Sequence, residues 1–217
     1  MTLAAFRERA NAVRAGGGGG ARRIVPLWRE VLFDNETPVS AFAKLRRSGG
    51  PFSFLLESAP AGGETWSRYS FLGSSPRAAW RLTDGLVEDW SPDAGWHNPR
   101  RPRDPLADLE ALIEHDVPLE VPEAGDFWSG AVGFFAYDVV RLIERLPNPP
   151  SKAVKSPDAL FVFTGALVII DNLRSHARVV VGVPIDARYS DDEVAAAYRT
   201  GLAEIERTIA TLRGPAA

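Results

Sequence analysis

The sequence predicts an α+β fold whose strands are mostly antiparallel neighbours. Apolar, β-rich runs come in adjacent pairs joined by short turns, and they do not alternate with helices. Stretches with helical spacing of apolar residues lie near both ends of the chain and between the strand pairs. The run 160–170 is apolar on both faces, so we expect it to meet a second sheet, part of which can lie outside these residues.

Length and composition describe an ordinary globular chain. With 217 residues, 45% of them hydrophobic, the chain is long enough to bury a large core in one domain. A net charge of −3 indicates neither a nucleic-acid nor a membrane partner. The absence of cysteine excludes disulfides and a thiol nucleophile. Arg7–Arg9 interrupt any signal peptide, and no apolar run nears the roughly 20 residues of a membrane span, so we expect a cytoplasmic protein.

The first elements alternate in type. Apolar spacing predicts a helix over 3–14, and Gly16–Gly20 are expected to be a flexible linker because they lack the Lys-Ser/Thr ending of a phosphate loop. Residues 24–33 predict a strand, in which Pro26 indicates an edge or a strand start. Thr37 and Pro38 begin a helix that ends at the glycines 49–50.

A hairpin at 52–58 and 66–73 has polar residues where its strands meet the turn. Glu57 and Ser58 end the first strand, and Arg68, Tyr69 and Ser70 open the second. Pairing the strands would bring a carboxylate, a hydroxyl and a guanidinium together beside aromatic rings, which is chemistry suited to a bound amino acid. A plain cross-strand ion pair between Glu57 and Arg68 explains the same residues, and both readings stay open.

The middle of the chain contains a second hairpin and a long loop. Strands 79–83 and 86–90 flank Asp84–Gly85, a strong type I′ turn signal. Residues 91–103 are predicted to be a solvated loop, since arginines 100, 101 and 103 between prolines define no phosphate site. Asp104 then caps a helix that begins at Pro105.

The last third is predicted to be a strand, a hairpin and a helix. Residues 128–137 read as a strand that becomes helical near Tyr137, and its glycines 130 and 133 indicate a bulge or a close backbone approach. Long strands at 160–171 and 177–183 follow, and a helix opens at Asp191.

No catalytic group stands out. His97, His115 and His176 lack metal-ligand spacing and are expected at the surface, and no G-x-S-x-G motif occurs. From residue chemistry alone the chain is a binding domain with a polar hairpin pocket and without catalytic, metal or cofactor residues.

Three blocks, in order, resemble one family. They cover Phe54–Ser58 with Gly62–Gly73 and Pro76; Gly130–Asp138 with Arg141 and Glu144–Pro147; and Pro157–Phe161 with Ile169–Asp171. The family is the N-terminal region of anthranilate synthase component I. The first block resembles its motifs LLES, GGE and GRYSFIG, the second resembles GAVGYxxYDxVRxxExLP, and the third resembles PDxxF…FD. The resemblance covers about residues 24 to 212, and Ser67 and Asn172 stand where the family usually has a glycine and a histidine.

The resemblance implies a sandwich of orthogonal antiparallel sheets flanked by helices, of which this chain holds the N-terminal half. It divides the chain into a flexible segment 1–21, a regulatory domain 22–213 and a tail 214–217. It implies an L-tryptophan feedback site, for which the expected residues are Leu56, Glu57, Ser58, Arg68, Tyr69 and Ser70. Glu57 suits the ammonium group and Arg68 the carboxylate.

The family's chorismate-binding, Mg²⁺-dependent catalytic half is expected to be a partner outside this chain, as is the glutamine amidotransferase subunit, so the chain alone is expected to be inactive. Two alternatives remain. One is the matching half of aminodeoxychorismate synthase component I, which has a similar fold. The other is a stand-alone amino-acid-binding module.

Overall fold

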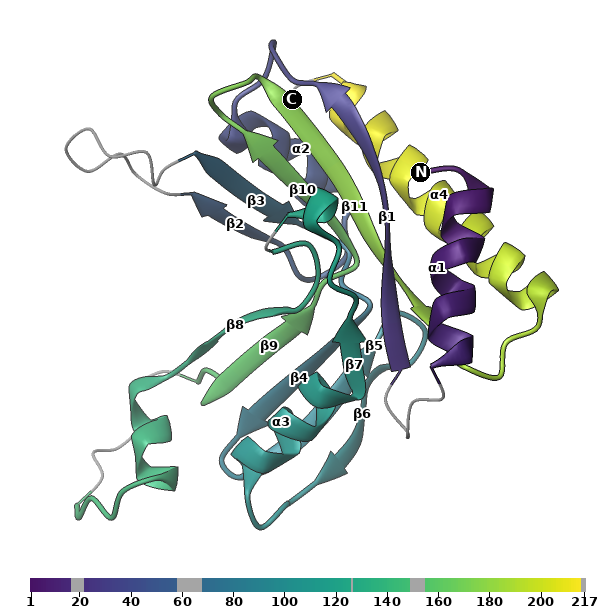
Figure 1. The fold of residues 1–217 in the computed structure, drawn as a ribbon. Helices are drawn as coiled ribbons and strands as arrows, with labels where there is room; N and C mark the ends of the chain where they lie inside the picture. Colours follow the sequence, from purple (N-terminus) through teal and green to yellow (C-terminus); the bar gives the residue numbers. More distant parts are fainter. Residues whose placement is uncertain (17–21, 58–67, 126, 149–154, 216–217) are drawn as a thin grey trace.

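The computed structural model describes residues 1–16, 22–57, 68–125, 127–148 and 155–215. Within them, two sheets form an α+β architecture, as predicted (Figure 1). The first sheet has the order β2 (Phe54–Glu57), β3 (Tyr69–Gly73), β10 (Ala166–Asp171), β11 (His176–Ile185), β1 (Arg22–Leu32) and β7 (Asp116–Pro118). The second has the order β6 (Gly95–Arg100), β5 (Leu86–Ser91), β4 (Ala78–Thr83), β9 (Ala159–Phe163) and β8 (Ala131–Phe135). Neighbouring strands are antiparallel except β1 and β7.

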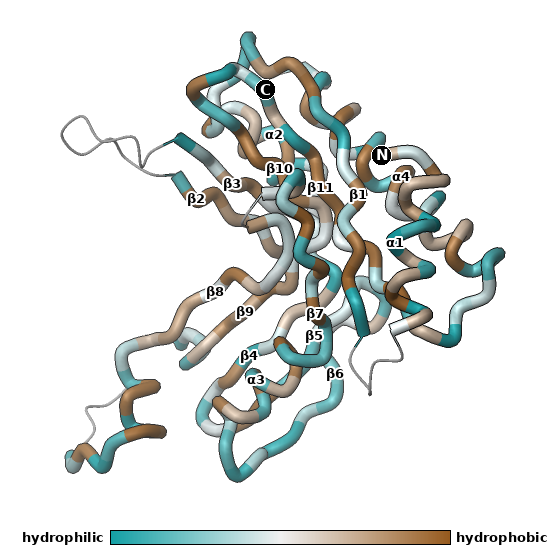
Figure 2. The backbone as a smooth tube through the Cα atoms, in the orientation of Figure 1, coloured by the Kyte–Doolittle hydropathy of each residue, from teal (hydrophilic) through white to brown (hydrophobic). Residues whose placement is uncertain are grey.

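Three α-helices cover one face of the first sheet: α1 (Leu3–Ala15), α2 (Pro38–Ser48) and α4 (Asp191–Arg213). Phe6 of α1, Leu27 of β1 and Ile205 of α4 are almost fully buried there. Figure 2 shows apolar residues gathered along β10 and β11 and polar residues on the outer loops. The predicted cap at Thr37 forms, since its side chain accepts from the amide of Ser40. Ser190, which was not predicted as a cap, accepts from the amide of Glu193 in the same way.

The opposite face of the first sheet is partly covered by the chain before β8, which includes the 3₁₀ turn Pro122–Ala124. Trp128 is 4% exposed and packs with Ile24 and Val180. Strand alternation therefore separates two cores on the two faces of this sheet.

The second sheet packs on α3 (Pro105–His115) around Trp80, Leu82 and Leu109. The 3₁₀ helix Tyr137–Leu142 adds Val139 to this core, where the sequence predicted helical residues. Asp84 and Gly85 have φ values of 50° and 74°, as the predicted turn between β4 and β5 requires.

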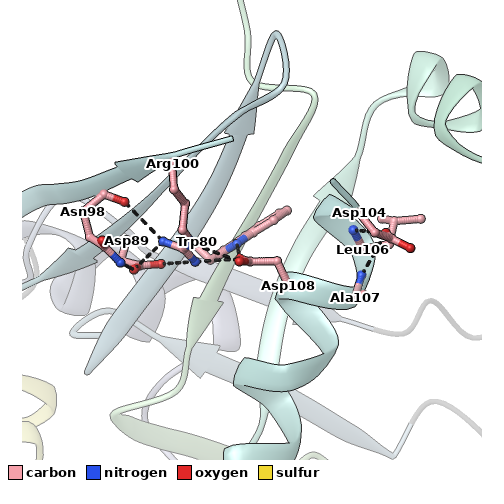
Figure 3. A network of polar contacts seen from close by, with 8 residues as sticks. All are labelled: Trp80, Asp89, Asn98, Arg100, Asp104, Leu106, Ala107 and Asp108. Atoms are coloured by element: carbon pink, nitrogen blue, oxygen red, sulfur yellow. Dashed lines mark hydrogen bonds and ion pairs between the residues drawn. The ribbon is translucent and has the colours of Figure 1, made fainter. Parts of the chain in front are cut away.

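The prediction of a loop over 91–103 is wrong, because residues 95–100 form β6, which pairs with β5. Arg100 explains why this strand is ordered (Figure 3). Its guanidinium binds Asp89 of β5, at 2.7 Å from Nη1, and Asp108 of α3, at 2.8 Å from Nε. Trp80 Nε1 also donates to Asp108 at 2.9 Å, and these bonds hold the pKa of Asp108 below its usual range, chiefly through Arg100. Arg100 thus joins the edge strand to the helix.

The prediction of one strand over 160–171 is also wrong. The chain leaves the second sheet after β9 and enters the first at β10, with Thr164 and Gly165 between them. The chain between β3 and β4 makes the reverse passage beside it, and Arg77 N donates to Phe163 O at 3.0 Å. A Cβ on Gly165 would lie 2.0 Å from the Ser75 carbonyl oxygen. We call residues 74–77 and 164–165 the crossing.

An ion triad ties the crossing to the first sheet. Asp116 of β7 accepts from Arg22 of β1, at 2.8 Å from Nε, and from Arg77 of the crossing. Burial raises the pKa of Asp116, but the two guanidinium groups lower it further, and the net effect is a pKa below the ordinary value. The Asp116 side chain is only 6% exposed, so loss of either arginine would leave a costly buried charge.

Glycine at the crossing leads to a stability prediction. Gly165→Ala should destabilise the chain by about 2–3 kcal/mol, because the new Cβ meets backbone that cannot rotate away. Gly50→Ala is the matched control, since a Cβ there meets nothing within 4 Å, and it should change stability by less than about 0.5 kcal/mol. Urea denaturation followed by circular dichroism measures both, and equal midpoints would contradict the close contact.

Candidate functional site

A cavity of about 500 Å³ lies where the polar ends of β3, β10 and β11 meet the chain before β8. Its volume is within the usual range for small-molecule sites, about 300–1,000 Å³. We call it the sheet cavity. It is lined by Glu30, Arg68, Tyr69, Phe71, Ala124, Gly125, Phe127, Ile169, Asp171, Arg174, His176, Ala177 and Arg178.

One wall of the sheet cavity is aromatic. Tyr69 and Phe71 are alternate residues of β3, so both side chains leave the same face of the sheet. The rings of Phe71 and Phe127 meet edge to face, 5.4 Å apart at 76°, and Tyr69 is 6.4 Å from Phe71. Such mutual contacts hold the rings in place before any ligand arrives.

Most of the charge in the sheet cavity is paired. Arg68 donates to both oxygens of Asp171, at 3.0 Å from Nε and 2.5 Å from Nη2, and its guanidinium lies 4.9 Å from the Tyr69 ring. Arg178 donates to Glu30 at 2.6 Å and to the Glu123 carbonyl oxygen. The hydrogen bonds from Arg68 come first among the causes that lower the pKa of Asp171.

The predicted pairing of the strands at 52–58 and 66–73 is confirmed as β2 with β3, but the polar residues are divided between two faces. Arg68 and Tyr69 line the sheet cavity, and Leu56, which is opposite Phe71, lies on the same face beside it. Glu57 and Ser70 face each other across the strands on the other face. Ser70 is fully buried and accepts from the Asn172 amide at 3.0 Å. Ser58 lies outside the described residues.

The expected convergence of Glu57 with Arg68 is wrong in this structure. Arg68 pairs with Asp171 on the next strand, and Glu57 has no hydrogen bond or ion pair with any residue in the described ranges. The physical reason is that Arg68 precedes the first residue of β3, so its side chain does not follow the alternation of the strand. Its guanidinium binds Asp171 on the cavity side, whereas Glu57 is opposite Ser70 on the other face.

The sequence reasoning missed Asp171, Arg178 and Phe127 as cavity residues. Asp171 ends β10 and Arg178 lies near the start of β11, both far along the chain from the hairpin, and pairing of β3 with β10 brings Asp171 opposite Tyr69. Only Asp171 stood in a family block, so no local pattern marked the other two.

The three histidines lie at exposed positions, as expected, although His176 also lines the sheet cavity. Across the described ranges, no group of three or more His, Cys, Asp or Glu residues is arranged to hold a metal ion. No helix in the same ranges has the length and hydropathy to cross a membrane.

The chain is similar in sequence to anthranilate synthase component 1 proteins. It is 36% identical over 170 residues to the anthranilate synthase component 1 of Aquifex aeolicus, covering 78% of this chain and 33% of that protein. It is 36% identical over 196 residues to the one from Pseudomonas aeruginosa, covering 88% and 37%. The crystal structure of anthranilate synthase component I from Streptococcus pneumoniae matches with a TM-score of 0.47 and 25% identity, covering 86% and 37%. No family model matches.

The fold and cavity define an α+β domain with a pocket of small-molecule size, and the comparisons show its family. The chain is a homologue of part of anthranilate synthase component I, as its sequence motifs indicated. It spans about a third of the length of the curated relatives it matches, 33% and 37% in the two cases above.

The pairing of Arg68 with Asp171 predicts an acid response. Because the folded pKa of Asp171 is lowered, the pair stabilises the fold above the unfolded pKa of about 3.9 and loses this effect as pH falls through the folded value. Arg68→Gln should therefore raise the pKa of Asp171 towards its ordinary value in a carboxyl ¹³C NMR titration. Arg188→Gln, which breaks the separate pair with Asp186, should leave Asp171 unchanged. If Asp171 titrated in Arg68→Gln as it does in the parent chain, Arg68 would not be the group that lowers the pKa of Asp171.

Proposed function

We propose that this chain is the regulatory part of an anthranilate synthase component I and that its sheet cavity holds L-tryptophan. The single observation that carries this proposal is the cavity itself. Arg68 and Tyr69, from the motif shared with the family, line it together with an aromatic wall, in a chain 36% identical to anthranilate synthase component 1 proteins. Apolar, aromatic walls with few polar groups suit an indole-bearing amino acid.

The proposed residue roles follow from the position of each residue on the cavity face, the opposite face or the edge of the first sheet. The indole packs on Tyr69, Phe71 and Phe127. In the strand order β2 is the terminal strand of its sheet, so backbone groups of Leu56 and Glu57 lie at an edge beside the cavity. Ser70, buried and bonded to Asn172, supports β3 from behind and keeps the wall in position.

The wider function is also a proposal. The complete enzyme converts chorismate and glutamine or ammonia to anthranilate and pyruvate, in tryptophan biosynthesis in the cytoplasm. Its chorismate-binding half needs Mg²⁺, and its amidotransferase subunit supplies ammonia. Bound tryptophan inhibits the enzyme by favouring its inactive arrangement, which requires that tryptophan binds that arrangement more tightly.

Calorimetry with L-tryptophan tests the site. We expect saturable binding by the 217-residue chain and about five- to tenfold weaker binding by Tyr69→Ala, because an aromatic contact is lost. Tyr137→Ala is the control, since this tyrosine is 88% exposed and does not line the cavity, and it should bind as the parent does. Absence of heat with the parent chain would remove the proposed function.

Chorismate turnover tests whether catalysis requires the half of the enzyme that is proposed to lie outside this chain. The isolated chain should form no anthranilate from chorismate, ammonium and Mg²⁺, because it corresponds to about a third of its relatives. Anthranilate fluorescence follows the reaction, and a full-length relative provides the positive control. Addition of a catalytic half should give turnover that tryptophan suppresses, and turnover by the chain alone would overturn the proposal.

A further inference from the structure

The charges of the sheet cavity do not cancel completely. Its two carboxylates, Asp171 and Glu30, are engaged by Arg68 and Arg178. Arg174 also lines the cavity, and its guanidinium has no hydrogen bond or ion pair to any residue in the described ranges. One cation is therefore left to meet an anionic group of a ligand.

Arg68 and Arg178 are poorly suited to that task. Arg68 makes a two-point contact with Asp171, whose side chain is 15% exposed, and drawing it to a ligand would leave that carboxylate unpaired. Arg178 already donates to Glu30 and to the Glu123 carbonyl oxygen. A ligand carboxylate that bound Arg68 would have to compete with Asp171. At Arg178 the two terminal nitrogens are engaged, and Nε, which has no partner in the described ranges, is buried.

The backbone of Arg174 is well fixed. Asp171 Oδ1 accepts from the amide of Leu173 at 3.1 Å and from that of Arg174 at 3.3 Å. The next residue, Ser175, has a φ of 52°, and its carbonyl oxygen accepts from Phe33 N at 2.8 Å. The turn between β10 and β11 is thus held from both sides, and only the Arg174 side chain must become ordered when a ligand binds.

We infer that Arg174 binds the carboxylate of the amino acid in the sheet cavity, while Arg68 and Asp171 form a neutral pair that positions the aromatic wall and the turn. This inference rests on the proposed function, because it assigns the orientation of the same ligand. The indole lies against Tyr69 and Phe71, and the carboxylate faces the turn that carries Arg174. The site therefore selects aromatic carboxylates over aromatic amines.

Three probes separate the carboxylate from the rest of the ligand: L-tryptophan, tryptamine, which lacks the carboxylate, and indole-3-propionate, which lacks the ammonium group. Calorimetry should show that Arg174→Ala weakens binding of the two carboxylates about tenfold or more, as expected for loss of a charge-assisted hydrogen bond. Binding of tryptamine should change by less than about twofold, since that probe has no group for Arg174 to contact.

Two further variants complete the design. Arg174→Lys keeps the charge and should recover part of the lost affinity for carboxylates. Arg199→Ala removes an exposed arginine of α4, on the helix-covered side of the sheet, and should leave all three probes unaffected.

The possible failures are distinct. If the parent chain binds no indole probe, the proposed function itself fails. If it binds L-tryptophan and Arg174→Ala binds all probes as the parent does, the cavity stands and the role of Arg174 is refuted. Equal weakening of tryptamine and the carboxylates would show that Arg174 supports the cavity structure only, and would likewise overturn the inference.

Discussion

The contact at the crossing between the two sheets is the constraint on which the rest of the structure depends. Gly165 and the Ser75 carbonyl oxygen approach so closely that no side chain fits between them. Thr164 adds a second fixed point, because its amide donates to Gly130 O at 2.9 Å and its hydroxyl accepts from Gly130 N at 3.1 Å. Three separate stretches of chain therefore pass between the sheets at one place, and the ion triad at Asp116 fastens it to β1 and β7.

The sheet cavity depends on this crossing. Its floor belongs to β3 and β10, which lead directly into the crossing, and part of its wall is Phe127, three residues before Gly130. The aromatic wall is therefore assembled from segments that are positioned together. A cavity built this way can keep its shape without a ligand, which reduces the ordering cost of binding.

Elements with local signals could be predicted from the sequence. Thr37 and Asp104 carry their own capping oxygens, and Asp84–Gly85 specify a turn within two residues. The break at Thr164–Gly165 could not be seen, because both flanking strands are apolar and only the close approach of Ser75, 90 positions away, ends the first one. β6 was missed because it also depends on contacts outside its own segment. Arg100 of β6 binds Asp89 of β5 and Asp108 of α3. For the candidate site, the motif identified the two paired strands, but the ion pair that draws Arg68 to Asp171 of the next strand could not be read from the hairpin alone.

Strand alternation in β3 also bears on the regulation proposed above. Tyr69 faces the sheet cavity and Ser70 faces the helices, so a ligand on one face and the packing on the other act on neighbouring residues of one short strand. A ligand can shift an equilibrium between two arrangements only by the difference in its affinity for them. β3 ends at the crossing and so belongs to both the cavity and the junction of the sheets. Any arrangement that moved the sheets relative to each other would therefore also change the walls that a ligand contacts, which is the physical condition for coupling the two.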